Sequence, residues 1–429
     1  MKENKLIISP EIEYSLDTHR TCLNNNVLVV GTSGSGKTQG LVKPNLHQAV
    51  GSYVVSDPKG RLYQEFSGYL RKRGYVVKIL DFTDPQNSCG YNPFQYIHSD
   101  LDVLKVAHML TYTHGENGSR ALDPFWDDAA ELLLAALIGY LREDCSVSER
   151  TLPNVYRLLD MLEFPDENDA YVGDSPLDIL FKELKNENPD SYASCLYSRF
   201  RTAAFRTLRS IMITAISKFA IFDNEELRTI LQKDDTDIGS IGRRKTAVFV
   251  TVSDTDRSLD PIANLFYTQA MNELCRVADK DYDGRLPVPV RFILDDFATN
   301  CQIAQMPRLI SCIRSREIST MLMIQAEAQL RAIYGEDGRT IVGNCDTYVY
   351  LGGADLETAR SISERADVPL QDVLNMPLGK MWVFRRGERP RMGRICLFGI
   401  DKDRDHDGDA KNDKGRAYRS TQVGFTRDI

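Results

Sequence analysis

The fold is decided by the run Asn26-Val27-Leu28-Val29-Val30 and by the eight residues after it, Gly31-Thr32-Ser33-Gly34-Ser35-Gly36-Lys37-Thr38. The first five residues are a short, β-branched apolar run, which predicts a buried strand that ends at glycine. The next eight match the pattern G-x-x-x-x-G-K-[ST], and the residues from Gly40 onward can continue as helix. Strand, glycine-rich loop and helix in this order predict a phosphate-binding loop.

The residue types of this loop indicate the ligand that it holds. Its glycines permit the loop conformation, so that successive backbone N–H groups, the helix N-terminus and the Lys37 ammonium face the β- and γ-phosphates of a nucleotide. The Thr38 hydroxyl can ligate Mg²⁺. The sequence therefore predicts that residues 31–38 bind ATP and Mg²⁺. The alternative is a glycine-rich turn that binds nothing.

Strand-like and helical stretches alternate on both sides of a long interruption. Before it, strands at Ser52–Ser56 and Tyr75–Leu80 flank a helix at Leu62–Arg73, as expected of βαβ units in a parallel sheet. After it, further strand candidates are separated by helices; they are Thr246–Val252, Val288–Leu294, Ser319–Ile324, Thr347–Leu351 and Lys380–Phe384. The predicted fold class is α/β with a mostly parallel central sheet.

The interruption, from about residue 101 to 232, has helical apolar spacing and almost no strand-like run, which predicts an all-helical inserted domain. Residues 1–100 and 233–400 are then the two parts of a nucleotide-binding domain, and 401–429 form an acidic, solvated tail. The helical stretches of the insertion are Asp123–Tyr140, Leu152–Leu162, Pro176–Leu184 and Tyr192–Phe219.

Composition restricts the partners and the cellular location that are expected for the chain. The 429 residues carry a net charge of -8, so any contact with nucleic acid must be local. The 9 cysteines are scattered without a Cys-x-x-Cys pair, which favours reduced thiols and a cytoplasmic location. The longest apolar run, Leu132–Leu141, is far shorter than the ~20 residues of a membrane-spanning helix, so the chain as given is expected to be soluble.

Catalysis by such a loop requires acidic partners, and the sequence offers two candidate positions. The run Phe292-Ile293-Leu294 ends in Asp295 and Asp296. Asp295 is placed to hold Mg²⁺ through water and Asp296 to polarise an attacking water. The alternative is a carboxylate pair at the end of a strand, on a solvated loop, without a catalytic role. A rival strand ends at Asp254 with a single acid, and it ranks lower for that reason.

Two further side chains are candidates for sensing the γ-phosphate. Gln325 ends the next predicted strand and could orient water, although a glutamine there could equally cap a turn. Arg314 and Arg316 lie in a helix-to-strand connection, from which a guanidinium could reach the γ-phosphate of a neighbouring subunit. The alternative for both arginines is an ordinary solvated position.

One segment of the insertion has a composition suited to nucleic acid. Residues 198–209 interleave four arginines with two phenylalanines, a combination that allows phosphate contact and base stacking. At helical spacing, however, the phenylalanines are better explained as core residues and the arginines as a solvated face.

Several motifs in order resemble the TraG-type coupling proteins of type IV secretion and conjugation, over about residues 5 to 398. The resemblance is carried by Gly31 to Thr38, Ser56-Asp57-Pro58-Lys59-Gly60, Tyr91-Asn92-Pro93-Phe94, Asp123-Pro124-Phe125-Trp126, Leu294-Asp295-Asp296-Phe297-Ala298, Gln325 with Gln329, and Gly343-Asn344-Cys345-Asp346 followed by Leu351-Gly352-Gly353.

The resemblance implies a RecA-like P-loop ATPase interrupted by an all-helical domain. It also implies a hexameric ring that couples DNA, held as a single strand by a relaxase, to the channel of a type IV secretion system. Arg314 matches the family's arginine best, which makes it the preferred residue acting in trans, with Arg316 second. The family usually has Asp-Glu after the strand, so Asp296, one methylene shorter, is expected to activate water more slowly or from a shifted pose.

The family usually carries an N-terminal membrane anchor, which this chain lacks, so contact with the membrane is expected only through a missing anchor or a partner.

Two other functions remain open from the sequence. With Asp296 in place of glutamate, the chain could be a docking platform that binds nucleotide and recruits the relaxase with little turnover. A soluble DNA pump of the FtsK/HerA kind is the third hypothesis, against which the motifs at 91–94 and 123–126 count.

Overall fold

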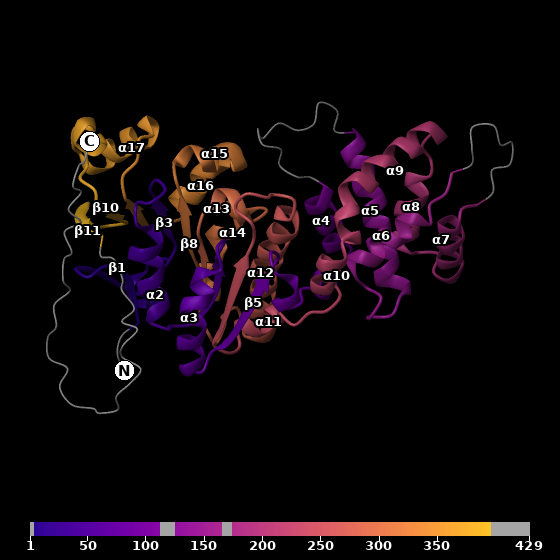
Figure 1. Cartoon of the computed structure of the whole chain (residues 1–429), viewed down its shortest axis with the longest axis horizontal. Coiled ribbons are helices and arrows are strands. Elements are labelled where there is room, and N and C mark those ends of the chain that lie inside the picture. The colour runs from indigo at the N-terminus through magenta and orange to yellow at the C-terminus, as the bar shows by residue number, and fades with distance from the viewer. Residues whose placement is uncertain (1–3, 112–124, 165–173, 396–429) are drawn as a thin grey trace, which may run out of the picture.

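The computed structural model describes residues 4–111, 125–164 and 174–395 of the chain (Figure 1). The predicted tail at 401–429 lies outside the described residues, as do the first two residues of the 123–126 motif. The described residues form a sheet covered by helices on both faces, and a group of helices that stands beside it (Figure 1). All cysteines within them have free thiols.

The sheet has nine strands in the order β11-β10-β9-β3-β8-β7-β4-β6-β5. Pairing is parallel from β9 to β5 and antiparallel at β10 and β11, so the predicted mostly parallel sheet is confirmed. The strands are β3 (Val27–Val30), β4 (Ser52–Ser56), β5 (Val76–Asp81), β6 (Thr246–Thr251), β7 (Val290–Leu294), β8 (Ile318–Ile324), β9 (Thr347–Tyr350), β10 (Lys380–Arg385) and β11 (Arg391–Arg394).

The central strands read as continuous apolar runs because both of their faces are covered. In β3, all four residues are fully buried. Val27 and Val29 face one core while Leu28 and Val30 face the other, as the two-residue period of a strand requires.

Each core is closed by different elements. One face packs against a hairpin and two helices, which are β1 (Lys5–Ser9), β2 (Ile12–Ser15), α2 (Lys43–His47) and α3 (Arg61–Lys72). The other face packs against α12 (Asp260–Asp281), α13 (Phe297–Asn300), α14 (Met306–Cys312), α15 (Glu327–Tyr334), α16 (Gly338–Gly343), α17 (Leu356–Ala366) and α18 (Leu370–Leu374). The short helices α1 (Thr18–Thr21) and α11 (Ile238–Ile241) lie in connections.

The helical group interrupts the chain between β5 and β6 (Figure 1). Its central helix, α5, is apolar on all sides and buried over residues 133–141, as a helix surrounded by others must be. The helices are α4 (Asp100–Thr111), α5 (Phe125–Asp144), α6 (Leu152–Asp160), α7 (Pro176–Glu187), α8 (Tyr192–Phe200), α9 (Phe205–Phe219) and α10 (Glu225–Leu231).

The expectation of one uninterrupted helical run at Tyr192–Phe219 is wrong, because α8 and α9 are separated near Ala204, whose backbone is extended. Phe200 is buried, and Phe205 packs edge-on against Phe164 at 5.4 Å. Arg201 forms an ion pair with Asp178 at 2.9 Å. These contacts give both phenylalanines a packing role, whereas contact of this segment with nucleic acid stays a prediction.

The motif at 91–94 joins the two groups of elements. The Tyr91 hydroxyl, fully buried, donates to Gln269 Oε1 at 2.6 Å, and Gln269 in turn donates to the Pro93 carbonyl at 3.1 Å. Asn92 donates to the Arg150 carbonyl at 2.9 Å. Because α12 carries Gln269, the motif fixes the segment that leads into the insertion against the helix that covers the sheet.

Candidate active site

The phosphate-binding loop is held by the residues at the ends of β8 and β9, the two strands that flank β3. The Gly31 N–H donates to the carbonyl of Ile324 at the end of β8, at 3.1 Å, and the Thr32 N–H donates to the Gly352 carbonyl after β9, at 3.3 Å. A Cβ on Gly31 would lie 2.8 Å from the Leu351 Cβ, closer than any side chain tolerates, and Gly36 has a φ of +92°. The loop therefore takes its shape from close packing at one glycine and left-handed backbone at another.

The interior of the loop fits a phosphate group. Lys37 is only 8% exposed, and its ammonium donates to the loop's own carbonyls, at 2.6 Å to Gly31 and 3.1 Å to Thr32. Burial lowers the Lys37 pKa, and the nearby Asp295 and Asp296 oppose this. The Ser35 hydroxyl is buried and has no hydrogen-bond partner among the described residues. A buried cation and an unsatisfied hydroxyl within a glycine-rich loop are what a phosphate would satisfy.

The first acid lies directly beside the loop. The Thr38 hydroxyl, which opens the π-helical segment η1 (Thr38–Val42), donates to Asp295 Oδ2 at 2.8 Å. Burial raises the Asp295 pKa, partly offset by that hydrogen bond. The Ser56 hydroxyl donates to the Asp295 carbonyl at 3.2 Å and fixes its backbone. A hydroxyl and a carboxylate oxygen this close are suitable Mg²⁺ ligands, so these residues fit the metal predicted for them.

Asp296 and Gln325 lie at the same edge of the sheet. Asp296 follows Asp295 with a left-handed backbone, φ +50°, which short polar side chains tolerate best among non-glycine residues. Gln325 follows Ile324, the residue whose carbonyl binds Gly31, and its side chain is exposed. Its backbone N–H donates to Gln329 Oε1 at 2.8 Å, which gives the second glutamine of the motif a role in shaping this turn.

The arrangement favours Asp295 over its rival. β8 and then β7 follow β3 in the sheet, whereas β6, which precedes Asp254, is four strands from β3, or ~19 Å at the usual strand spacing. Asp254 is exposed and its carboxylate lies 3.8 Å from the Lys59 ammonium.

The two arginines lie at the opposite edge of the sheet. Both are in the turn η5 (Arg314–Arg316), immediately before β8, whereas the loop packs at the far end of that strand. Arg316 pairs with both carboxylate oxygens of Asp279, at 2.9 and 2.8 Å. Arg314 is exposed, and its described hydrogen bond is to the Thr18 carbonyl at 3.1 Å. Neither can contact the loop of its own chain.

Sequence reasoning assigned no role to several residues that shape the site. Ser56 fixes the first acid, Gly352 accepts a bond from the loop, and Ile395 lies against Gly36, where an added Cβ would meet its side chain at 3.3 Å. Ser56 and Gly352 belong to the quoted motifs, and their positions at strand ends were the sequence signal that could have identified them. Ile395 follows a polar edge strand and had none.

The family model for type IV secretory system conjugative DNA transfer matches residues 3–366. The chain belongs to this family. It is 23% identical to the protein VirD4 of Agrobacterium fabrum, over 79% of this chain and 48% of that protein. It is 24% identical to a conjugal transfer protein TraG of Escherichia coli, over 79% of this chain and 54% of TraG. The chain thus spans about half the length of these curated relatives.

The fold is shared with a solved coupling protein. The conjugative coupling protein TrwBdeltaN70 in its unbound form superposes with a TM-score of 0.69 at 17% identity, covering 93% of this chain and 90% of TrwBdeltaN70. TrwB has also been solved with the ATP analogue ADPNP and with ADP and Mg²⁺. The RecA-like α/β fold predicted from the sequence is confirmed by this likeness. No helix among the described residues combines the length and apolarity that crossing a bilayer needs.

Proposed function

We propose that this member of the conjugative DNA transfer family is an ATPase that drives DNA into a type IV secretion channel. The observation that carries the proposal is the 2.8 Å hydrogen bond from Thr38 to Asp295. It joins the phosphate-binding loop to an acidic strand end across the intervening strand β8, which itself ends at Gln325. A nucleotide-binding loop, a metal-binding acid, a second acid and an amide thus share one edge of the sheet.

The chain's own residues divide the work of hydrolysis. Residues 31–38 hold ATP, with the Lys37 ammonium on the β- and γ-phosphates. Thr38 and Asp295 hold Mg²⁺, which when bound offsets charge on the phosphates. Asp296 accepts a proton from the attacking water, and Gln325 orients that water. Arg314 from a neighbouring copy neutralises charge that develops on the γ-phosphate.

The proposal extends to the assembly and its partners. Because Arg314 lies across the sheet from its own loop, each site needs a second copy, and a hexameric ring would supply one to every subunit. Its partners are then single-stranded DNA, the relaxase that carries it and the channel proteins. The place of work is the cytoplasmic face of the membrane, reached through an anchor or a partner protein.

The experiment is steady-state ATP hydrolysis at low salt across a range of protein concentrations, with and without single-stranded DNA. We expect phosphate release to rise more than linearly with protein, to increase with DNA and to vanish in Lys37→Ala. Lys43→Ala is the matched control, because Lys43 lies in the helix after the loop but pairs with Glu65 at 2.6 Å. ATP binding without Lys37-dependent turnover would contradict the proposal and favour the docking platform, for which the short Asp296 is the motivating feature.

A further inference from the structure

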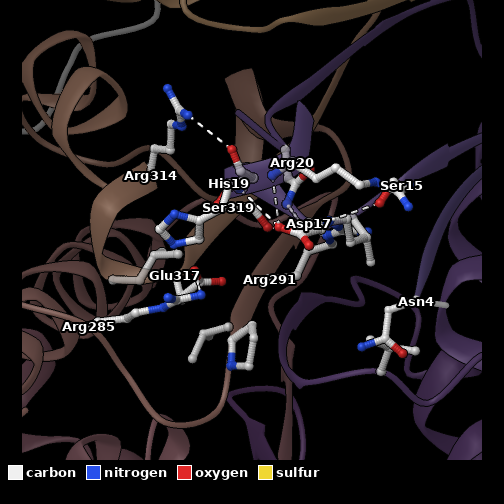
Figure 2. Close-up of a pocket in the computed structure, with 17 residues that line it drawn as sticks. Asn4, Ser15, Asp17, His19, Arg20, Arg285, Arg291, Arg314, Glu317 and Ser319 are labelled. Carbon is white, nitrogen blue, oxygen red and sulfur yellow. Dashed lines mark hydrogen bonds and ion pairs between the residues drawn. The ribbon is translucent and has the colours of Figure 1, made fainter. Parts of the chain in front are cut away.

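A cavity of about 670 Å³ opens at the amino-terminal edge of the sheet, across the strands from the phosphate-binding loop (Figure 2). Its walls are the segment 15–20 after the β1–β2 hairpin, the first residues of β7 and β8, and the turns before them. This volume lies within the usual range for small-molecule sites.

The cavity carries more positive than negative side chains. Its lining includes four arginines, at positions 20, 285, 291 and 314, against the two acids Asp17 and Glu317. Glu317 is paired with Arg285 at 2.8 Å. The Asp17 carboxylate accepts the backbone N–H groups of His19 and Arg20, at 3.0 and 3.1 Å. Both acids are thus engaged, and the lining holds two more arginines than carboxylates.

Arg291 is the most unusual of these residues. It lies on β7, is only 8% exposed, and donates from Nε to the Ser319 hydroxyl at 3.3 Å. No described carboxylate is within ion-pair distance of Arg291, and burial lowers its pKa. A guanidinium removed from water without an anion is costly, and such a residue is retained where an anion completes it.

We propose that this cavity binds a phosphate group, with Arg291 at its centre and Arg20 at its rim. An arginine fork matches phosphate oxygens in pairs, and a phosphate monoester, close to dianionic at neutral pH, balances two positive charges where a carboxylate would balance one. Two sources present this chemistry: a free phosphorylated molecule, or the nucleotide on a second copy of this chain. Only the second source rests on the proposed function.

The test uses the full chain with Lys37→Ala, which disables the phosphate-binding loop. In the first arm, calorimetry measures binding of inorganic pyrophosphate. In the second, fluorescence anisotropy measures association of labelled Lys37→Ala chain with wild type that carries a non-hydrolysable ATP analogue. Each arm is repeated with Arg291→Met, Arg291→Lys and Arg20→Gln added to the Lys37→Ala chain. Arg243→Gln is the control, an arginine outside the cavity that pairs with Asp281.

We expect Arg291→Met to weaken binding about tenfold or more in at least one arm, since a hydrogen bond to a charged group is lost. Arg291→Lys should retain part of the affinity, Arg20→Gln should reduce it, and Arg243→Gln should leave it unchanged. An effect in the first arm alone identifies a free phosphorylated ligand, and one in the second alone identifies the neighbour's nucleotide. Binding that is absent from both arms, or that is unaffected by Arg291→Lys and Arg20→Gln in folded protein, overturns the proposal.

Discussion

Arg314→Ala is the substitution that separates a shared active site from a self-contained one. Arg314 lies four residues before Ile318, the first residue of the seven-residue strand β8, and Gln325 immediately follows the strand. At ~3.3 Å per residue the strand spans roughly 23 Å, three to four times the reach of an arginine side chain. The Arg314 side chain can therefore contact a γ-phosphate only at the site of another copy.

The expected magnitudes differ sharply between stability and turnover. The exposed Arg314 side chain makes one described hydrogen bond, to the Thr18 carbonyl, so its removal should cost at most about 1 kcal/mol of unfolding free energy. An arginine that acts in trans on the γ-phosphate contributes about 10³- to 10⁵-fold to turnover. Nucleotide affinity of the isolated chain should stay unchanged, because its own loop is at the far edge.

The assay mixes two inactive proteins, Arg314→Ala and Lys37→Ala, and measures phosphate release. A site is competent when a chain with intact Lys37 has a neighbour with intact Arg314, so random equal mixing in a head-to-tail ring should restore about one quarter of wild-type turnover. Arg316→Ala is the matched control: it breaks the pair with Asp279 and should lower the melting temperature but leave turnover largely intact. A mixture that stays inactive although both proteins fold and exchange subunits would refute the reasoning, as would weaker nucleotide binding by Arg314→Ala alone.

Three further outcomes are expected. Asp296→Asn keeps a residue that tolerates the left-handed backbone but removes the proposed proton acceptor. Turnover should therefore fall about 10²- to 10⁴-fold with nucleotide binding intact, measured by phosphate release and calorimetry. Asp295→Asn should abolish Mg²⁺-dependent turnover yet raise the melting temperature. Burial raises the Asp295 pKa, so the wild-type protein loses folding stability as the pH rises from the ordinary pKa of an aspartate through the raised one. Urea titrations across that pH window should show a flatter dependence of stability on pH for the variant. Gly31→Ala should cost about 1–3 kcal/mol in urea unfolding, because its Cβ would lie 2.7 Å from the Ser35 hydroxyl and 2.8 Å from the Leu351 Cβ.

Local patterns were sufficient to predict the strands and the loop. A fully buried parallel strand must be apolar throughout, so Val27–Val30 and its neighbours stand out, and the carboxyl ends of parallel strands meet at one edge. That rule predicts that Asp295 and Gln325 lie at the edge that carries the loop. The bond from Thr38 to Asp295 joins residues 257 positions apart, however, and depends on β8 lying between β3 and β7, an order that the sequence does not state.

The elements that were not predicted are those whose stability comes from their neighbours. β11 reads Arg391-Met-Gly-Arg394 and has no apolar alternation, yet it forms an edge strand because β10 supplies the backbone partners. Arg291 was likewise indistinguishable from a surface arginine, since its burial follows from β4 and β8 on either side of β7. Position within a strand pattern predicts burial, but it does not reveal that a buried charge lacks a carboxylate partner among the described residues.

The polarity of a parallel sheet separates its two kinds of connection, because loops after strands and turns before strands lie at opposite edges. Among the parallel strands β9 to β5, the loops that follow the strands lie at one edge, where the phosphate-binding loop and the acids are. The turns that precede these strands lie at the other edge, with Arg314 and the cavity around Arg291. If the arginine edge of one copy serves the loop edge of the next, the contact joins two different surfaces. An open head-to-tail pair leaves the loop edge of one copy and the arginine edge of the other without a neighbour. Only closure into a ring therefore completes every site. The mixing experiment tests the shared site directly, because an interface that pairs loop edge with loop edge would bring no arginine to any loop and could not restore turnover.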